Sequence, residues 1–333
     1  MSGMELFKRV FQGEPSKGEQ ESVSITDRLK VEEQLTFQTQ ILEKSGIIEI
    51  FADSKMGIRG IDNKEYPVPT LDEVTKRLDN NRDIILPKIK QGFTKLLIVP
   101  FAYSFDALLE KCGQTILRHH RQGKLLGIEE GKIWLPGVGK EPFKLDKNKP
   151  IRSRDVYNNC DVEGKIVYFP EEFSENHHGQ TKSELLAADS TNAWQIWLLE
   201  DLPNIPEEGK GRRVGRRKQL EGRGSPDEFL TILQTEKRYK NESGLTPETE
   251  LMYFLTHLEE TNRVINHNTR HFDFHNGVLS FQVGAYFPHS GAVPYLYWSS
   301  DFDHNRADLV LNYFCHPMTR GLGFGVHPGV RVK

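Results

Sequence analysis

The residues best suited to recognising another molecule are concentrated near the end of the chain. Residues 283 to 332 contain no lysine, glutamate or glutamine, whereas the preceding 282 residues contain 66 of them. Aromatic and short polar residues take their place. Tyrosine and tryptophan give a large contact area at little cost in rotamer freedom, and serine, asparagine and aspartate form adaptable hydrogen bonds. This composition predicts a binding surface, although a β-rich core with its turns would also disfavour lysine and glutamate.

The predicted ligand contacts divide into aromatic anchors and adaptable polar groups. The anchors are Tyr295, Tyr297, Phe302, Tyr313 and Phe314. The polar contacts are Ser299, Ser300, Asp301, Asp303, His304, Asn305, Asp308, Asn312, His316 and Arg320. Because successive side chains of a strand point to opposite faces, a register error of one residue would invert which of them face outward.

Three histidines at regular spacing are the strongest candidate for a metal site. His267, His271 and His275 recur every four residues with Asp273 among them, so on a continuous helix they would share one face and could bind zinc. The residues between them are poor helix formers, and the Asn-Gly pair at 276–277 predicts a turn. We therefore expect a polar connection, and no metal or cofactor.

A basic stretch at residues 210–223 is the candidate for phosphate or nucleic-acid binding. It contains Lys210, Arg212, Arg213, Arg216, Arg217, Lys218 and Arg223. No aromatic residue accompanies these cations to stack on bases, and no phosphate-cradling glycine motif is formed. A solvated loop is favoured over a nucleic-acid site.

Nothing in the sequence forms a complete catalytic constellation. No Gly-x-Ser-x-Gly nucleophile motif occurs. Cys315 and His316 are adjacent, but neighbouring residues of a strand point to opposite faces and do not form a thiolate–imidazolium pair. The expectation is a protein that is not an enzyme.

Hydrophobic periodicity predicts the elements that position these residues. Helices are expected over residues 26–44, where Val31, Leu35, Gln38 and Leu42 form one stripe, from Thr70 to 80, and over 104–123. Further helices are expected over 182–188, from Ser225, and from Thr246, while the strand candidates are 47–51, 57–61, 96–100, 165–169 and 194–199. From residue 278 onward the chain is expected to form short strands and turns.

Composition and punctuation predict the domain organisation. Residues 1–24 are expected to be a disordered leader, residues 25–150 an N-terminal α+β accessory domain, and residues 151–333 the ligand-binding domain, with its variable surface at about 295–325. Three widely spaced cysteines indicate a reducing compartment. With no apolar run long enough for a signal peptide or a membrane span, we expect a cytoplasmic protein without a membrane partner.

Three segments of the C-terminal region resemble a known family. They are Gly284-Ala-Tyr-Phe-Pro-His-Ser-Gly-Ala-Val-Pro294, Tyr297-Trp-Ser-Ser300 and Gly323-Phe-Gly-Val-His-Pro-Gly-Val-Arg-Val332. The stretch 284–332 resembles the end of C-type-lectin-fold proteins of the formylglycine-generating-enzyme type. More narrowly, it is similar to the variable proteins of diversity-generating retroelements. The resemblance implies a C-type-lectin-like domain with a small twisted antiparallel sheet. With the helices predicted before it, the expected fold is α+β, in which a helix-rich N-terminal domain carries this C-terminal domain.

The resemblance also implies a function. Such proteins bind ligands non-covalently through a surface that adenine-directed mutation diversifies, and mutated asparagine codons cannot become lysine, glutamate, glutamine, methionine or tryptophan. Trp298 and Met318 would then be fixed, and Trp298 would pack beneath the loops. The ligand would be a macromolecule or a small molecule, with protein the expected class and nucleic acid disfavoured. The competing class is a lectin-fold metal-dependent oxidase or hydrolase using the three histidines or Cys315, although the related oxidases use two cysteines in this region.

Overall fold

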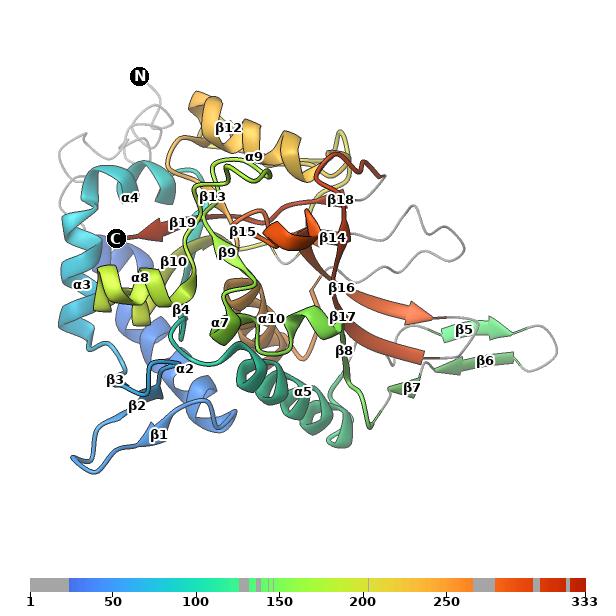
Figure 1. Ribbon diagram of the computed structural model, residues 1–333, viewed down its shortest axis with the longest axis horizontal. Coiled ribbons are helices and arrows are strands. Elements are labelled where there is room, and N and C mark those ends of the chain that lie inside the picture. Colours follow the sequence, from blue (N-terminus) through green and yellow to red (C-terminus); the bar gives the residue numbers. More distant parts are fainter. Residues whose placement is uncertain are drawn as a thin grey trace, which may run out of the picture.

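The computed structural model describes residues 24–125, 132–135, 139–142, 144–145, 147–202, 204–265, 279–301, 306–321 and 324–333. Within these ranges only the backbone is described for 132–135, 139–142, 144, 299–301, 306–307 and 313–315. The predicted leader lies outside the described residues except for Ser24. Helices and several small, mainly antiparallel sheets make up the described part, which confirms the α+β class (Figure 1).

A four-stranded antiparallel sheet forms the centre of the molecule. Its order is β13 (Ser243–Gly244), β19 (Pro328–Val332), β10 (Gln195–Glu200) and β4 (Phe93–Val99). Every residue of 96–99 and of 195–199 is buried. A continuous apolar run of this kind is typical of a strand that is covered on both faces.

The helices of the N-terminal half pack beside this sheet. They are α1 (Ile25–Leu29), α2 (Val31–Lys44), α3 (Leu71–Asn80), α4 (Arg82–Ile89) and α5 (Phe105–Arg121). The predicted helix over 26–44 is broken at Lys30, whose φ of 50° is left-handed. The capping box predicted from Thr70 is confirmed, because its hydroxyl accepts from the Glu73 N–H and the Glu73 carboxylate accepts from the Thr70 N–H.

Side-chain amides of α2 complete the outer edge of strand β4. Gln34 accepts from the Leu96 N–H (2.8 Å) and donates to the Thr94 carbonyl (3.0 Å). Gln38 accepts from the Ile98 N–H (2.6 Å) and donates to the Leu96 carbonyl. Each glutamine therefore takes the place of one peptide group of a neighbouring strand. This pairing satisfies backbone groups that an uncovered edge would leave unpaired.

The second sheet carries the C-terminal region. Its main path is β18 (Phe324–Gly325), β14 (Leu279–Phe281), β16 (Val293–Asp301), β17 (Arg306–Cys315) and β7 (Lys144–Leu145), and β8 (Ile151–Ser153) also pairs with β17. The β14–β16 and β16–β17 pairs are antiparallel, whereas β18, β7 and β8 pair in parallel. The predicted short strands are thus one long hairpin with flanking strands, which extends to the right in Figure 1.

Helix α10 (Pro247–Thr261) joins the two sheets. It contacts β4 of the central sheet and β16 of the second sheet, as well as α2 and α5. Every residue from Pro247 to Leu258 is buried. The start predicted at Thr246 is confirmed, because its hydroxyl accepts from the Thr249 N–H.

The structure corrects the predicted domain boundary near residue 150. Strand β4, from the predicted N-terminal domain, is the direct neighbour of β10 from the predicted C-terminal domain. One hydrophobic core also includes buried residues from Ile25 to Val332. The division fails because strand pairing between distant segments leaves no mark in local composition. The two predicted domains share a sheet and a core.

The remaining elements are short or peripheral. They are β1 (Glu49–Ile50), β2 (Met56–Arg59), β3 (Glu65–Pro67), β5 (Lys132–Leu135), β6 (Gly139–Pro142), η1 (Asp155–Tyr157), α7 (Cys160–Glu163), β9 (Val167–Tyr168), α8 (Lys182–Ala188), η2 (Ser190–Ala193), β11 (Arg213–Val214), β12 (Arg217–Lys218), α9 (Pro226–Thr235), η3 (Lys237–Tyr239), β15 (Ala285–Tyr286) and η4 (Pro288–Ser290). No helix in the described ranges is long and apolar enough to cross a membrane.

Candidate functional site

The register of the β16–β17 hairpin separates a buried inner face from an outer face. Leu296 pairs with Leu311 and Trp298 with Leu309, and these four side chains are at most 1% exposed. Trp298 points toward α10, where its ring stacks on Phe254 at 6.3 Å between ring centroids. The burial of Trp298 agrees with its expected role as scaffold.

Aromatic side chains form a continuous row on the other face of the sheet, where the fully buried Phe281 belongs to a second hydrophobic core against which Tyr295 and Phe324 pack. The rings of Tyr295 and Tyr297 are both half-buried and stack at 6.1 Å with an interplanar angle of 30°. Tyr295 also meets the edge of Phe281 (6.2 Å, 89°), and Phe281 meets Phe324 (5.4 Å, 81°). This aromatic row, Phe324–Phe281–Tyr295–Tyr297, crosses strands β18, β14 and β16. It brings together two predicted anchors with two aromatic residues that the sequence analysis did not select.

The structure corrects the prediction for Asp308, which is buried rather than available to a ligand. Its carboxylate receives a hydrogen bond from Arg152 Nη2 at 3.1 Å, and Arg152 Nε lies 3.1 Å from its other oxygen. Arg152 belongs to β8, which runs parallel to β17. Asp308 therefore fixes β8 against the hairpin. No local pattern marks this pair, because 155 residues lie between its members.

Three further predicted contacts lie beyond the aromatic row. Asn312 is half-buried, and its backbone carbonyl accepts from the Tyr157 hydroxyl at 2.8 Å. His316 is exposed, and its Nδ1 accepts from the Met318 N–H at 3.3 Å. Arg320 is exposed and forms an ion pair with Glu228 at the start of α9, with Arg320 Nε donating at 2.8 Å.

The other predicted contacts cannot be placed as side chains. Phe302, Asp303, His304 and Asn305 lie outside the described residues. Ser299, Ser300 and Asp301 belong to β16, and Tyr313 and Phe314 to β17, with the backbone alone described. The structure thus brings Tyr295 and Tyr297 together and places Asp308 in the interior.

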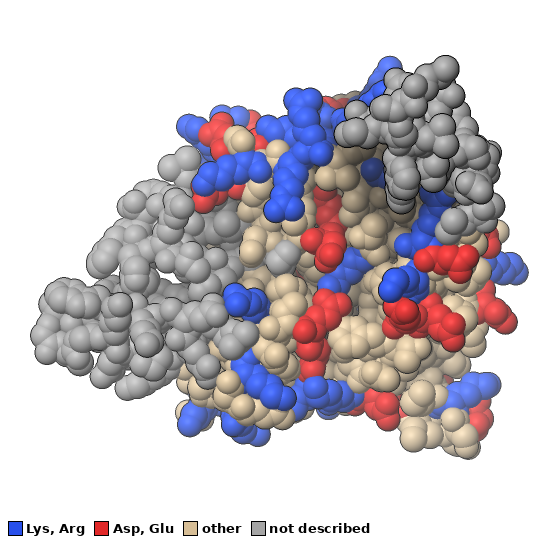
Figure 2. All heavy atoms as spheres, turned by 180° about the vertical axis from the view of Figure 1, so that it is seen from behind, with Lys and Arg blue, Asp and Glu red and all other residues tan. Residues whose placement is uncertain are grey.

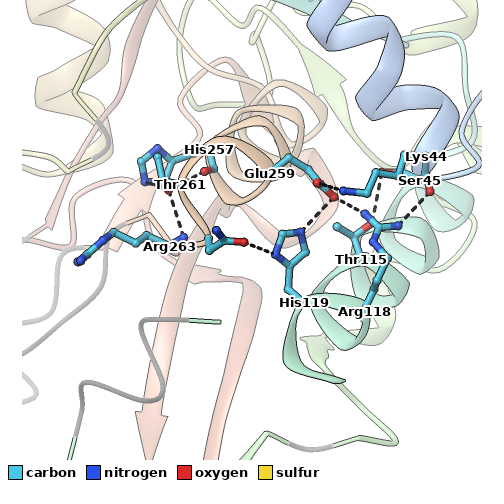
Figure 3. Close-up of polar contacts among 10 residues, drawn as sticks. Lys44, Ser45, Thr115, Arg118, His119, His257, Glu259, Thr261 and Arg263 are labelled. Carbon is cyan, nitrogen blue, oxygen red and sulfur yellow. Dashed lines mark hydrogen bonds and ion pairs between the residues drawn. The ribbon is translucent and has the colours of Figure 1, made fainter. Parts of the chain in front are cut away.

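A polar cluster around Glu259 ties α10 to α2 and α5 (Figure 3). The Glu259 carboxylate contacts Lys44 at 2.5 Å, His119 Nε2 at 3.1 Å and the Arg118 guanidinium. Burial would raise the pKa of Glu259, but hydrogen bonds from His119 and Lys44 and the nearby positive charge lower it to about 2. His119 Nδ1 also lies 3.1 Å from Asn262 Oδ1. A carboxylate held ionised among three cationic or polar partners is suited to structure rather than to proton transfer.

A second cluster has the residue types of a hydrolase triad but not its geometry. His327 Nδ1 lies 2.7 Å from Glu250 Oε1 and 3.3 Å from the Ser280 hydroxyl. In a triad the serine and the acid contact opposite ring nitrogens, whereas here they share one. His327 and Tyr253 line a cavity of about 10 Å³, which is room for about one water molecule. This cluster does not provide an activated nucleophile.

The basic stretch 210–223 is not the solvated loop that the sequence favours throughout, because Arg217 is buried, and Arg217 is not available for the alternative of phosphate binding. Arg217 is 1% exposed and is held by Glu242 at 2.6 Å and by Glu200 at 2.6 Å. Lys218 and Arg223 form ion pairs with Glu221 and Glu208. Figure 2 shows acidic and basic side chains interspersed over the face seen from behind. Arg217 is therefore a structural residue. On the face drawn in Figure 2, positive and negative side chains are both present.

The described residues contain no group of three or more histidine, cysteine, aspartate or glutamate side chains that could hold a metal ion. His267, His271 and His275, which carried the metal alternative, lie outside the described residues. Cys112 and Cys160 are buried free thiols, and burial raises the pKa of both. Neither thiol is in the state that a nucleophile needs.

Comparison with protein-family models, curated proteins and solved structures finds no match. The geometry of the site is therefore the basis for any functional conclusion.

Proposed function

We propose that this protein binds a ligand non-covalently through the outer face of the β16–β17 hairpin. The observation that carries the proposal is the stacked pair Tyr295 and Tyr297, which is half-buried on the face of the hairpin opposite to the buried side chains of Leu296 and Trp298. Aromatic side chains with both an apolar face and a hydroxyl are characteristic of binding-surface anchors. The expected ligand class is protein, and no catalytic step is proposed.

The two faces of the hairpin suit a division of labour between scaffold and recognition. Truncating a buried aromatic such as Trp298 typically costs about 3–5 kcal/mol, because a cavity remains. Substitutions on an exposed surface usually change stability by no more than about 0.5 kcal/mol. The half-buried positions Tyr295 and Tyr297 could therefore change at a smaller cost than the buried positions on either face, which keep the fold.

We further propose that the C-terminal half is C-type-lectin-like and that a retroelement diversifies the hairpin. The pairing of the final strand β19 with β10, beside a separate sheet that carries the hairpin, supports this fold. The absence of lysine, glutamate and glutamine from residues 283–332 supports diversification. So does the burial of Trp298, a position that such mutation could not produce.

Saturation mutagenesis of β16 and β17 with a protease-resistance readout tests the binding proposal. Most substitutions at Tyr295 and Tyr297 should leave the protein folded, whereas most polar substitutions at Leu296 and Trp298 should not. A library of the folded outer-face variants should then yield binders to unrelated proteins. Equal intolerance of the two faces, or a folded library from which no binder emerges, would refute the proposal.

The diversification proposal has a separate genomic test. The locus should contain a near-copy of the DNA encoding roughly residues 295–325, differing only at adenines, next to a reverse-transcriptase gene. A locus without that copy would remove diversification and leave the binding proposal in place.

A further inference from the structure

A lysine and two carboxylates meet in the interior, away from the hairpin and the polar clusters described above. Lys182 is the first residue of α8, Asp161 lies on α7, and Glu248 lies in the first turn of α10. Lys182 Nζ lies 2.7 Å from Asp161 Oδ1 and 2.9 Å from Glu248 Oε1. The side chains of Lys182 and Glu248 are 0% exposed and that of Asp161 is 3% exposed, so water has no access to the reacting atoms.

The surroundings of this constellation are aromatic and hold the three groups in place. Lys182 Nζ lies 5.2 Å from the centroid of the Phe101 ring and 5.9 Å from that of Tyr168. The Tyr168 hydroxyl donates to Glu248 Oε1 at 2.6 Å, and the Phe105 N–H donates to the second oxygen of Asp161. Asp161 Oδ1 is thereby directed at the lysine. Glu248 Oε2 has no hydrogen-bond partner among the described residues and is the site where a transferred proton can be held.

From this geometry we propose that Lys182 and Asp161 condense spontaneously to an intramolecular amide, with Glu248 relaying the protons. Two carboxylates and one ammonium leave the site with an uncompensated buried negative charge, and each buried charge carries a large desolvation cost. Condensation reduces three buried charges to one. Holding the amine and the carboxyl carbon together also replaces a bimolecular encounter with a step inside one molecule, which strongly favours reaction.

The reaction balances without any co-reactant. Lys182 passes one proton to Glu248, and the lone pair of the neutral amine forms a bond from Nζ to Cγ of Asp161. The Cγ–Oδ1 bond then breaks, and Oδ1 leaves as water with the proton held by Glu248 and a second proton from Nζ. One ammonium and one carboxylate become one amide and one water, with no change in net charge or oxidation state.

Lys182 carries a positive charge before the reaction, as the proton count above requires. Burial alone would lower the pKa of Lys182, but Asp161 and Glu248 outweigh that effect and raise it above its usual value. Lys182 therefore starts as an ammonium, and the carboxylate of Glu248, 2.9 Å from Nζ, is the group that accepts its proton in the proposed reaction. The product would link α7 covalently to the start of α8. This proposal does not depend on the ligand-binding function.

Intact-mass spectrometry of the purified, denatured full-length chain tests the proposal directly. The wild-type protein should be lighter than its sequence predicts by one water. A tryptic digest should contain the Asp161 peptide joined to an uncleaved Lys182. Lys182→Arg should restore the full mass, since a guanidinium is a poor nucleophile. Lys88→Arg, which alters another buried lysine in contact with a carboxylate (2.5 Å from Glu242), should keep the loss of water.

Two further variants examine the chemistry. Asp161→Asn should lose one ammonia in place of one water, because the leaving group is then an amide nitrogen. Glu248→Gln should have its full calculated mass while keeping a native circular-dichroism spectrum. A wild-type chain of full mass would overturn the proposal whatever the variants do. A water loss that persists in Lys182→Arg would overturn the assignment to these residues, and one that persists in Glu248→Gln would overturn the proton relay.

Discussion

Replacing Gln38 by alanine should destabilise the protein more than the replacement of a polar side chain on the surface usually does. The side chain is 2% exposed and satisfies two backbone groups on the edge of β4, the Ile98 N–H and the Leu96 carbonyl. Each backbone group left buried without a partner costs about 1–3 kcal/mol. For two backbone groups the combined cost is about 2–6 kcal/mol. Since the shorter alanine leaves space that a water molecule can enter, we expect the free energy of unfolding to fall by about 3 kcal/mol, in the lower half of that range.

Gln34→Ala is the matched control for this substitution. Gln34 makes the same kind of contact with Leu96 and Thr94 one helical turn earlier, but it is only half-buried, so water can replace it. We expect a loss of about 1 kcal/mol for this control. Urea unfolding at pH 7 gives both free energies of unfolding by linear extrapolation, and amide hydrogen exchange should accelerate at Ile98 in Gln38→Ala. A smaller loss for Gln38→Ala than for Gln34→Ala would refute this account of the edge.

Three further predictions concern protonation and packing. Burial first, and the positive charge of Lys95 second, lower the pKa of His257 from 6.5 to about 4. Between these two pH values the unfolded chain therefore binds more protons than the folded protein. The free energy of unfolding of the wild type, measured by urea titration, should fall by about 2 kcal/mol from pH 7 to pH 5, and this fall should be absent from His257→Gln. Glu259 has a lowered pKa of about 2, so the stability it contributes is present above about pH 4.5 and is lost as the pH falls through 2. Glu259→Gln should cost about 2 kcal/mol at pH 7 by chemical denaturation, an estimate discounted because Lys44 is half-exposed. Trp298→Ala should cost about 3–5 kcal/mol and Tyr297→Ala about 1 kcal/mol in the same assay, and equal costs would contradict the assignment of inner and outer faces.

Local signals in the sequence are sufficient for three helix starts but not for every helix, since α4 (Arg82–Ile89) is not predicted. Thr70, Ser225 and Thr246 are recognisable as helix starts because the capping bond joins residues three apart, and the structure contains all three caps. Periodicity alone predicts that Gln38 lies in the buried stripe of its helix, and the structure supplies the reason for a polar residue there. It faces a strand edge rather than an apolar core.

Pairings between distant segments account for what the sequence did not predict. The neighbours of β4 and of β8 lie about 100 and 160 residues further along the chain, so neither the shared sheet nor the Arg152–Asp308 pair leaves a local pattern. Strand register places Tyr297, Val310 and Asp308 on one face of the hairpin, because Tyr297 pairs with Val310 and Asp308 lies two residues before Val310. Asp308 is buried on that face by its ion pair with Arg152 of β8, which register alone does not predict.

The replacement of a strand by helix α2 has a geometric limit. Four residues of a helix advance about 6 Å, whereas two residues of a strand advance about 6.8 Å, so a row of amides loses alignment with the strand at each repeat. Over two glutamines the mismatch is small enough for both amides to pair with the strand. The positions four residues before and after them hold no amide, because they are Lys30, where the helix breaks, and the apolar Leu42. The strand needs no third amide, because the next outward-facing backbone position is Pro100, which has no N–H to donate. At the Pro100 end of β4, the row of glutamine amides therefore ends where the strand has no further N–H group to pair.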